Sequence, residues 1–482
     1  MIALYLLSQI TFITQFMQPA QAASNVFRST TYELQTGEYT GTTYNLSLNN
    51  NLSANYFVMI SGPSSITNGR GVNEDRTRVS GDPHGNFVTN TAANEIELTR
   101  GSTNNDWIGA LTVVECLIDC TQGGFELREV LETSLPAGTA NGLQTETDTL
   151  SANHTSNTVP FGGLYGGGMS SSGSDNNEYA VTLAVKLTKT ASNEITYQRY
   201  GGESRIPAAA TFTTYVVEWG SNWTVQDTNV GGISSGTGID AAAEYDTGSI
   251  SPVNRDNTWV WGGGYNRDDG LGDGPLGQAI TLGDGVNQNA TENTVAVGAE
   301  GAMNSPGRDF QVYVMSNNDL AVDYRFRIRG DQGGPSGFQG LNAAVDAAIS
   351  TETYDNVATD VQYTEGFRAP VFYATSGGTG QAYSRTGAWG LRHDSSTNLS
   401  YWRAYSGQPV TGWFQSIDFA NITFSNVNTE QLTYRWRDDS TDLNTTGGWL
   451  EAENTAVSGI SKNQSLRLRM QVANTGTTPE DA

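Results

Sequence analysis

Asn193-Glu-Ile-Thr-Tyr-Gln-Arg199 and Thr211-Phe-Thr-Thr-Tyr-Val-Val-Glu-Trp219, joined by a connection that contains Gly and Pro, decide the fold of this chain. Each run is rich in β-branched and aromatic residues, and each is bounded by small polar residues, which is the pattern of a strand. We therefore read the stretch as two β-strands, one ending in an arginine and the other carrying a glutamate near its end.

The same pattern recurs at both ends of the chain. Near the start it reads Asn94-Glu-Ile-Glu-Leu-Thr-Arg100 and Asp106-Trp-Ile-Gly-Ala-Leu-Thr-Val-Val-Glu115. Near the end it reads Asn398-Leu-Ser-Tyr-Trp-Arg403 and Thr411-Gly-Trp-Phe-Gln-Ser-Ile-Asp-Phe419. Self-similarity with a period of about 100 residues indicates a chain of repeated modules.

A divergent further copy fits between residues 258 and 315, with Thr258-Trp-Val-Trp261 and Phe310-Gln-Val-Tyr-Val-Met315. The chain has 482 residues, 56 of them Gly, and only 16% are charged. Short apolar runs broken by turn residues predict an all-β fold of tandem antiparallel β-sandwich modules of the jelly-roll or immunoglobulin-like kind.

The predicted boundaries lie in small polar stretches, where few contacts should cross. The predicted parts are an apolar segment at 1–23, modules at 24–135, 136–232, 233–345 (the divergent copy) and 346–430, and a C-terminal β module or set of strands completed by a neighbour at 431–482.

Residues 1–23 contain no charged residue and end in Ala-Gln-Ala before Ala23. That ending is typical of a signal-peptidase site, although no Lys or Arg precedes the apolar run. The alternatives are a retained apolar helix, in a membrane or in the core of a filament, and a segment buried in the core of a domain. The first two imply export, and any membrane contact is expected only through these residues.

The formal net charge is −25, from 50 acidic and 25 basic residues. A polyanion would be repelled by such a surface, so nucleic acid is not expected as a partner. The acidity suits an extracellular protein that takes up Ca²⁺, or one kept soluble by charge repulsion.

Asp268, Asp269 and Asp273 lie among glycines and form a candidate Ca²⁺ loop. The spacing lacks the complete EF-hand pattern, and a solvent-exposed turn is the alternative. Cys116 and Cys120 are the only cysteines, and in an exported chain they are expected to form a disulfide, with two reduced thiols as the alternative.

Each copy of the repeat places an arginine before an acidic residue at a similar interval. We expect cross-strand charge pairs that support each sheet, with a carbohydrate or ion contact as the alternative. The predicted pairs are Arg100 with Glu115, Arg199 with Glu218, and Arg403 with Asp418.

Beyond the last copy, aromatic or aliphatic residues alternate with Arg435, Arg437, Arg467 and Arg469. Such alternation predicts strands with one buried and one charged face. The charged face is either solvated or a basic strip that binds a ligand.

The pattern of an apolar strand, an arginine-terminated strand and a closing Val-Val-Glu-Trp-like strand resembles the tandem β-sandwich modules of bacterial surface proteins and phage fibres, which are similar in layout to H-type lectin domains. The resemblance covers roughly residues 31–425, and the segments that carry it are 94–115, 193–219 and 398–419. Residues 434–476 resemble modules of large secreted bacterial repeat proteins. This resemblance implies a surface or filament function and transfers no sugar site.

We therefore expect an extracellular structural protein, a subunit of a homopolymeric surface filament or layer that assembles through sheet edges or the N-terminal segment. The alternative is a carbohydrate-binding adhesin or phage fibre that contacts surface glycans through Trp261, Tyr265 and Trp389. No nucleophile signature is found, so an enzyme is not expected.

Overall fold

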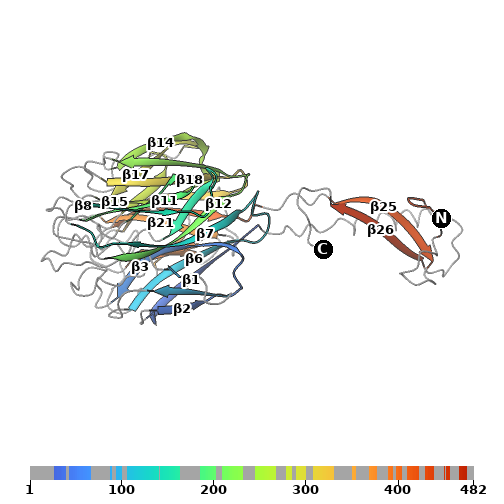
Figure 1. Cartoon of the computed structure of the whole chain (residues 1–482), viewed down its shortest axis with the longest axis horizontal. Coiled ribbons are helices and arrows are strands. Elements are labelled where there is room, and N and C mark those ends of the chain that lie inside the picture. Colours follow the sequence, from blue (N-terminus) through green and yellow to red (C-terminus); the bar gives the residue numbers. More distant parts are fainter. Residues whose placement is uncertain are drawn as a thin grey trace. The chain divides into compact units, whose positions relative to one another are not determined.

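The structure is a computed structural model of the chain. It describes residues 26–39, 43–66, 87–88, 94–99, 106–139, 142–162, 185–201, 209–231, 245–266, 278–284, 289–299, 308–330, 350–353, 368–376, 389–393, 398–403, 410–422, 429–438, 450, 452–455 and 466–474. Nearly all described elements are strands, and all described strand pairs are antiparallel (Figure 1). The predicted all-β fold of antiparallel β-sandwich modules is confirmed.

Six strands form the first repeat. They are arranged in two three-stranded sheets, with orders β1-β6-β3 and β2-β5-β4. The strands are β1 (Phe27–Tyr39), β2 (Thr43–Ser47), β3 (Asn55–Ile66), β4 (Phe87–Val88), β5 (Glu95–Thr99) and β6 (Asp106–Cys116).

The second repeat has the same connectivity, with sheet orders β7-β12-β9 and β10-β11-β8. In Figure 1 its strand β7 lies beside β3 of the first repeat. The strands are β7 (Phe125–Leu135), β8 (Gly142–Thr149), β9 (Thr158–Gly162), β10 (Lys186–Ala191), β11 (Glu194–Gly201) and β12 (Ala210–Trp219).

The third repeat follows this plan again, with sheet orders β13-β18-β15 and β14-β17-β16. A single 3₁₀ turn, η2 (Arg255–Asn257), precedes its third strand. The strands are β13 (Thr224–Gly231), β14 (Tyr245–Asn254), β15 (Thr258–Asn266), β16 (Gln278–Leu282), β17 (Thr291–Ala299) and β18 (Arg308–Ser316).

The fourth repeat has the orders β19-β24-β21 and β20-β23-β22, and β21 also pairs with β16, which joins two three-stranded sheets into one of six strands. In every repeat the sixth strand is therefore central in the sheet that also contains the first and third strands, and the fifth strand is central in the other sheet. We call the sixth strand of each repeat its central strand. The strands are β19 (Ala321–Gly330), β20 (Ser350–Thr353), β21 (Arg368–Ser376), β22 (Trp389–His393), β23 (Asn398–Arg403) and β24 (Val410–Asp418).

Strand pairing places the start of the second, third and fourth repeats one strand before the predicted boundary. The segment at 125–130 follows the first Val-Val-Glu run in sequence, but as β7 it pairs with β12 of the second repeat. Likewise β13, which begins at Thr224, pairs with β18 of the third repeat. The connections between successive repeats are therefore the short segments 117–124, 220–223 and 317–320.

The second repeat shows why each unit is a sandwich. Its two sheets bury a common apolar core, contributed by alternate positions of strands in both sheets. That core consists of Leu135, Leu150, Val185, Leu187, Ile195, Tyr197, Phe212 and Val216. Every residue of β9 is buried, although only one of its faces can point into this core. The other face must therefore be covered by a neighbouring repeat.

The four repeats lie against one another in cyclic order. The fourth strand of each repeat lies against the next repeat: β4 against β12, β10 against β15, β16 against β21, and β22 against β3. The last of these contacts joins the fourth repeat to the first. Residues 25–422 form one compact unit as a result, so the modules are not separate beads along the chain.

Aromatic side chains from all four repeats meet in a cluster that we call the shared aromatic core. Phe57 stacks on Phe161 of the second repeat at 4.1 Å between ring centroids, and Phe27 stacks on Phe419, just after the last strand, at 4.6 Å. All members are at most 5% exposed. They are Phe27, Phe57, Phe125, Phe161, Trp219, Trp223, Trp259, Trp261 and Phe419.

Side-chain amides also join neighbouring repeats at their backbones. The Gln415 Oε1 accepts from the Val260 N–H at 2.9 Å, and its Nε2 donates to the Val260 carbonyl. The buried Gln415 therefore replaces a strand partner along the edge strand β15. Asn55 Oδ1 accepts from the Leu127 N–H at 2.9 Å and joins the first repeat to the second. Both contacts satisfy backbone groups that burial would otherwise leave unpaired.

A charged contact joins the second repeat to the third. The ammonium group of the buried Lys186, on β10, lies 2.9 Å from Asp309 Oδ1 and donates to Asn229 Oδ1 at 3.0 Å. The Tyr313 hydroxyl, on β18, accepts from the Lys189 N–H at 2.9 Å in the same region. Polar as well as apolar contacts therefore fix the order of the repeats.

A second compact unit contains residues 1–24 and 423–482. Its described strands are β25 (Thr429–Asp438) and β26 (Leu466–Asn474), which pair antiparallel. Residues 1–23, including the predicted signal or assembly segment, lie outside the described residues. Among the described elements there is no helix with the length and apolarity needed to cross a bilayer.

Phe57→Ala is expected to destabilise the whole unit of residues 25–422, because it leaves a cavity in a core that all repeats share. The free energy of unfolding should fall by about 3–5 kcal/mol, measured by chemical denaturation monitored by circular dichroism. Leu143→Ala, at a position that is 42% exposed on β8, is the control and should change it by less than about 0.5 kcal/mol. Equal losses in the two variants would contradict a shared core.

Candidate functional site

A carboxylate recurs near the end of the central strand in three of the four repeats. Glu115 on β6 and Asp418 on β24 are 4% and 2% exposed, and the side chain of Glu218 on β12 is 11% exposed. In the third repeat Ser316 occupies the position opposite the first residue of the third strand, and its hydroxyl lies 2.8 Å from that of Thr258. A buried carboxylate requires a partner, which makes these positions the candidate site.

Glu115 is held by a two-pronged arginine contact. Arg28 lies directly opposite it on β1, and the Arg28 Nε and Nη2 donate to Oε2 at 2.6 Å and Oε1 at 2.7 Å. The Ser53 N–H also donates to Oε1 at 2.8 Å. The hydrogen bond to Glu115 raises the pKa of Arg28, while partial burial opposes it. The contact joins all three strands of one sheet, because Ser53 lies two residues before the start of β3.

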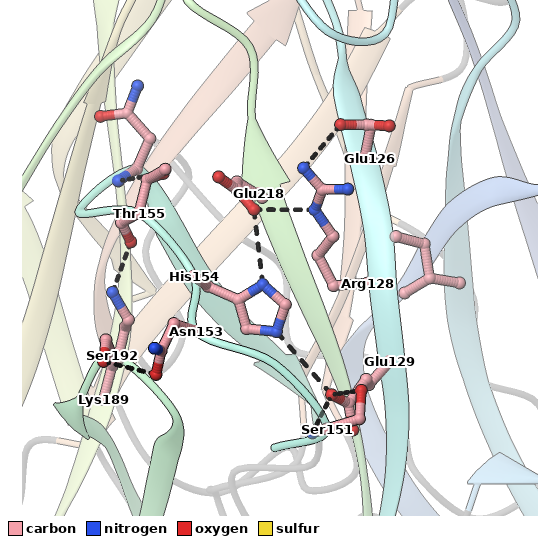
Figure 2. Close-up of polar contacts among 12 residues, drawn as sticks. Glu126, Arg128, Glu129, Ser151, Asn153, His154, Thr155, Lys189, Ser192 and Glu218 are labelled. Carbon is pink, nitrogen blue, oxygen red and sulfur yellow. Dashed lines mark hydrogen bonds and ion pairs between the residues drawn. The ribbon is translucent and has the colours of Figure 1, made fainter.

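The second repeat surrounds its carboxylate with more charges (Figure 2). Arg128 on β7 donates from Nε to Glu218 Oε2 at 2.7 Å, and its Nη2 lies 2.7 Å from Glu126 Oε2. The imidazole of His154 lies between two carboxylates, with Nδ1 3.5 Å from Glu218 Oε2 and Nε2 3.8 Å from Glu129 Oε1. The His154 side chain is only 5% exposed.

The connection after β8 positions this histidine. The His154 N–H donates to the Ser192 carbonyl at 2.8 Å, which attaches the connection to the turn between β10 and β11. Glu129 Oε1 accepts from both the N–H and the hydroxyl of Ser151 at 2.6 Å. At 3.5 and 3.8 Å the contacts of the ring with Glu218 and Glu129 are longer than hydrogen bonds. The imidazole is therefore an ion-pair partner of these carboxylates only when it is protonated.

The pKa of the Glu218 carboxyl is lowered. Burial alone would raise it, but hydrogen bonds from Thr155 and Arg128, together with the positive charge of Arg128, outweigh that effect. The carboxylate form is therefore favoured in the folded protein. The same contacts that stabilise the charge also connect β12 to β7 and to the connection that carries Thr155.

The predicted pairing of Arg199 with Glu218 is wrong. Arg199 is buried on β11, where it donates to Gln144 Oε1 at 2.5 Å and to the Pro136 carbonyl at 2.7 Å. Burial lowers its pKa to about 10. Pro136 follows the end of β7 that pairs with Ala210, eight residues before Glu218 along β12. At about 3.3 Å per residue, the arginine and the glutamate lie near opposite ends of the sandwich.

The other two predicted pairs are only partly covered by the described residues. Arg100 lies outside them, and the partner of Glu115 is Arg28. Arg403 is described in its backbone only, on β23, in a different sheet from Asp418 on β24. Arg368 is the residue opposite Asp418 in the strand register, as Arg28 is opposite Glu115. For the second repeat, the recurring interval in the sequence thus reflects recurring strands and not a contact, and the pairs of Arg100 with Glu115 and Arg403 with Asp418 stay predictions.

Arg28, Arg128 and His154 were missed by sequence reasoning. A signal for the two arginines was present, because each lies one or three residues after a buried phenylalanine, Phe27 or Phe125, that opens the first strand of a repeat. Aligning the first strands of the repeats, as well as the later strands, would have revealed them. No comparable pattern marks His154, which lies in a connection.

Cys116 and Cys120 form a disulfide, as the sequence analysis expected. It lies in the connection between the first two repeats, directly beside Gly124. A Cβ atom at position 124 would lie 2.3 Å from the Cys116 sulfur, so this position tolerates only glycine without a rearrangement. The disulfide therefore fixes the connection close to the shared aromatic core.

Other predicted site residues have different outcomes. The candidate Ca²⁺ ligands Asp268, Asp269 and Asp273 lie outside the described residues. Within the described part of the chain, no group of three or more His, Cys, Asp or Glu side chains is arranged to hold a metal ion. Trp261 and Tyr265, expected to be exposed to glycans, are 5% and 1% exposed, so that expectation is wrong.

No protein-family model and no curated protein sequence matches this chain. The resemblance to surface and fibre modules therefore stays a prediction. The function must be inferred from the geometry of the repeats and of their charged ends.

Arg28→Gln is expected to cost more stability than Arg128→Gln. The first change leaves the nearly buried Glu115 without its bidentate partner and should lower the free energy of unfolding by about 3 kcal/mol. The second removes an arginine that is 36% exposed and should cost about 1 kcal/mol. Urea denaturation of both variants tests this order. Equal losses of the free energy of unfolding would show that the Arg28 contact is not more stabilising than the Arg128 contact.

The stability of the unit is expected to fall in acid partly through Glu218. Its folded pKa lies below the unfolded value of about 4.3, so its contribution is present above that value and is lost as pH falls through the folded pKa. Glu218→Gln should therefore lower stability at neutral pH and reduce the pH dependence of unfolding between about pH 5 and pH 3. The exposed Glu132 on β7 provides the control, Glu132→Gln, which should stay within about 0.5 kcal/mol of wild type at neutral pH. An unchanged acid slope in Glu218→Gln would refute the assignment.

Proposed function

We propose that this chain is an extracellular structural protein, a subunit of a homopolymeric surface filament or surface layer. The observation that carries the proposal is the use of the same strand position for a buried or largely buried carboxylate in three repeats. Glu115 and Glu218 are each engaged by an arginine of the first strand in the same repeat. These carboxylates recur with the module, and each is engaged by an arginine inside its own repeat. Such groups support the proposal of a scaffold more than that of a reaction centre.

The packing of the repeats supports the same proposal. One unit of four sandwiches, closed on itself and sharing an aromatic core, is a rigid body of the kind that a regular assembly needs. Its net charge keeps such bodies soluble until specific contacts form. The disulfide between Cys116 and Cys120 supports an oxidising location outside the cytosol.

The alternative of a carbohydrate-binding adhesin or fibre has less support. Glycan recognition by stacking requires exposed aromatic faces, but Trp261 is buried in the shared aromatic core. Tyr265 is also buried, and its hydroxyl donates to Asp309 Oδ2 at 3.1 Å. The side chain of the third residue of that hypothesis, Trp389, lies outside the described residues.

Electron microscopy of the purified full-length chain, over a range of protein and salt concentrations, tests the proposal. We expect ordered filaments or sheets with a regular repeat, because the body is rigid and acts as its own partner. Sedimentation velocity should show the corresponding concentration-dependent mass. Monodisperse single particles under all conditions, together with specific retention on a glycan array, would contradict the proposal and favour an adhesin.

A further inference from the structure

The acceptor motif for N-linked sugar, Asn-x-Ser/Thr in which x is not proline, recurs in the closed body. Residues 25–422 contain seven asparagines that begin such a motif. The motif has a physical meaning where its asparagine lies at the surface of an exported chain, because the attached sugar is bulky and hydrated. The structure describes the exposure of six of the seven, and all six are exposed. They are Asn45, Asn51, Asn153, Asn222, Asn289 and Asn421.

The strand register defines one end of the closed body, which we call the connection end. In each repeat the last residue of the central strand lies opposite the first residue of the first strand. These pairs are Cys116 with Phe27, Trp219 with Phe125, Ser316 with Thr224, and Asp418 with Ala321. Because the connections between successive repeats are short, all four pairs and the connections themselves lie at the same end of the body.

Five of the six exposed acceptors lie at the connection end. Asn222 and Asn421 are in the segments that directly follow β12 and β24. Asn153 precedes the histidine that lies beside Glu218. The last two are Asn51, whose carbonyl accepts from Arg28, and Asn289, in the turn that contacts η2 through the Ala290 carbonyl and the Arg255 N–H.

The opposite end of the body has a different sequence pattern. Strands are joined there by the segments between the first and second, third and fourth, and fifth and sixth strands of each repeat. These segments contain ten asparagines, and none of the ten is followed by Ser or Thr two residues later. The motifs are therefore concentrated at one end, although asparagine is frequent at both.

Asn153 and Asn222 have the same local arrangement. The residue in the middle of each motif is buried, as His154 in one and Trp223 in the other, whereas the asparagine before it and the threonine after it are exposed. The buried residue fixes the backbone, and its two neighbours point away from the core. A sugar on either asparagine would therefore extend into solvent without disturbing the packing.

The amide of Asn153 is held through its oxygen. Its Oδ1 accepts from the Ser192 hydroxyl at 3.0 Å (Figure 2). This contact does not use Nδ2, the amide atom that bonds to the sugar in an N-linked glycan. The side chain is thus fixed in place without engaging the atom that would be modified.

We propose that the exposed acceptors at the connection end are N-glycosylated, with Asn153 and Asn222 as the principal sites. The inference rests on the export that is part of the proposed function, and the Cys116–Cys120 disulfide fits the same compartment. The donor is an oligosaccharide joined through C1 of its first sugar to a lipid phosphate, and a transferase of the producing cell catalyses the step. Nδ2 bonds to C1, the bond from C1 to the phosphate oxygen breaks, the lipid phosphate leaves, and the transferase accepts the amide proton.

Glycans at this position restrict how copies of the chain can associate. A bulky, hydrated sugar prevents a protein surface from packing closely on another. The connection end is therefore kept free of close contacts between subunits. Subunits of the proposed filament or layer associate through the sides or the opposite end of the closed body.

The test is peptide mapping by mass spectrometry of the full-length chain purified from the cells that naturally produce it. We expect added sugar mass on the peptides that contain Asn153 and Asn222. The peptide that contains Asn229 is the internal control. This asparagine is exposed on β13 but does not begin the motif, so it should carry no sugar.

Two variants of one residue, produced in the same cells, test whether the motif is read. Thr224→Ala keeps Asn222 but removes the hydroxyl of its motif, so the sugar on Asn222 should be lost while that on Asn153 remains. Thr224→Ser keeps the hydroxyl and should keep the sugar on Asn222. Circular dichroism verifies that both variants are folded. If Thr224→Ala does not fold, the wild-type map and the Thr224→Ser map decide the matter.

The outcomes separate the inference from the proposed function. Unmodified asparagines at all six exposed positions in the natural chain overturn the inference, and so does sugar on Asn222 that persists in folded Thr224→Ala. If that unmodified chain still forms polymers, the structural function stands. A glycosylated chain that stays monomeric at every protein and salt concentration supports the glycosylation sites and overturns the homopolymer.

Discussion

Burial of aromatic rings where the four repeats meet is the constraint on which the rest of this structure depends. A three-stranded sheet has two faces, and a single sandwich covers only one of them. In this protein the second face of the inner sheets carries large side chains such as Phe57, Phe161 and Trp259, which are fully buried. Each repeat therefore exposes a large apolar surface unless its neighbours are present, and the compact body is obtained only when all four are assembled.

The charged groups follow from that packing. The carboxylates near the ends of the central strands are largely buried. Arginines of the first strands neutralise Glu115 and Glu218, and the residue opposite Asp418 is Arg368 on the third strand of its repeat. The third repeat shows that the charge is dispensable, because Ser316 and Thr258 make a neutral contact at the corresponding position. The polar groups at this end of each sandwich connect neighbouring strands and so stabilise the sheets. The second repeat has the largest set of such groups, around His154.

The sequence predicted the strands well and their contacts poorly. The alternating runs at 94–100 and 310–315 and the repeat period identified the strands, the all-β class and the divergent third copy, because these depend on local pattern. The partner of Glu115 could not be found in this way, since Arg28 lies 87 residues away and reaches it only through strand pairing. Trp261 was expected at the surface, and this was wrong because another repeat covers the outer face of its strand. The alternation of residues within one strand gives no information on such packing between repeats.

Cyclic packing of the repeats has a consequence for how such a protein can change over evolutionary time. Open arrays of repeats lengthen or shorten by duplication or deletion of a single unit, since each unit touches only the one before and the one after. Here the ring of Phe27, at the beginning of the first unit, rests on that of Phe419, at the end of the last. A fifth unit would have to separate these rings, and a deleted one would leave a gap between them. The copy number is therefore fixed at four by geometry, and variation is confined to the connections and to the segments outside the closed body.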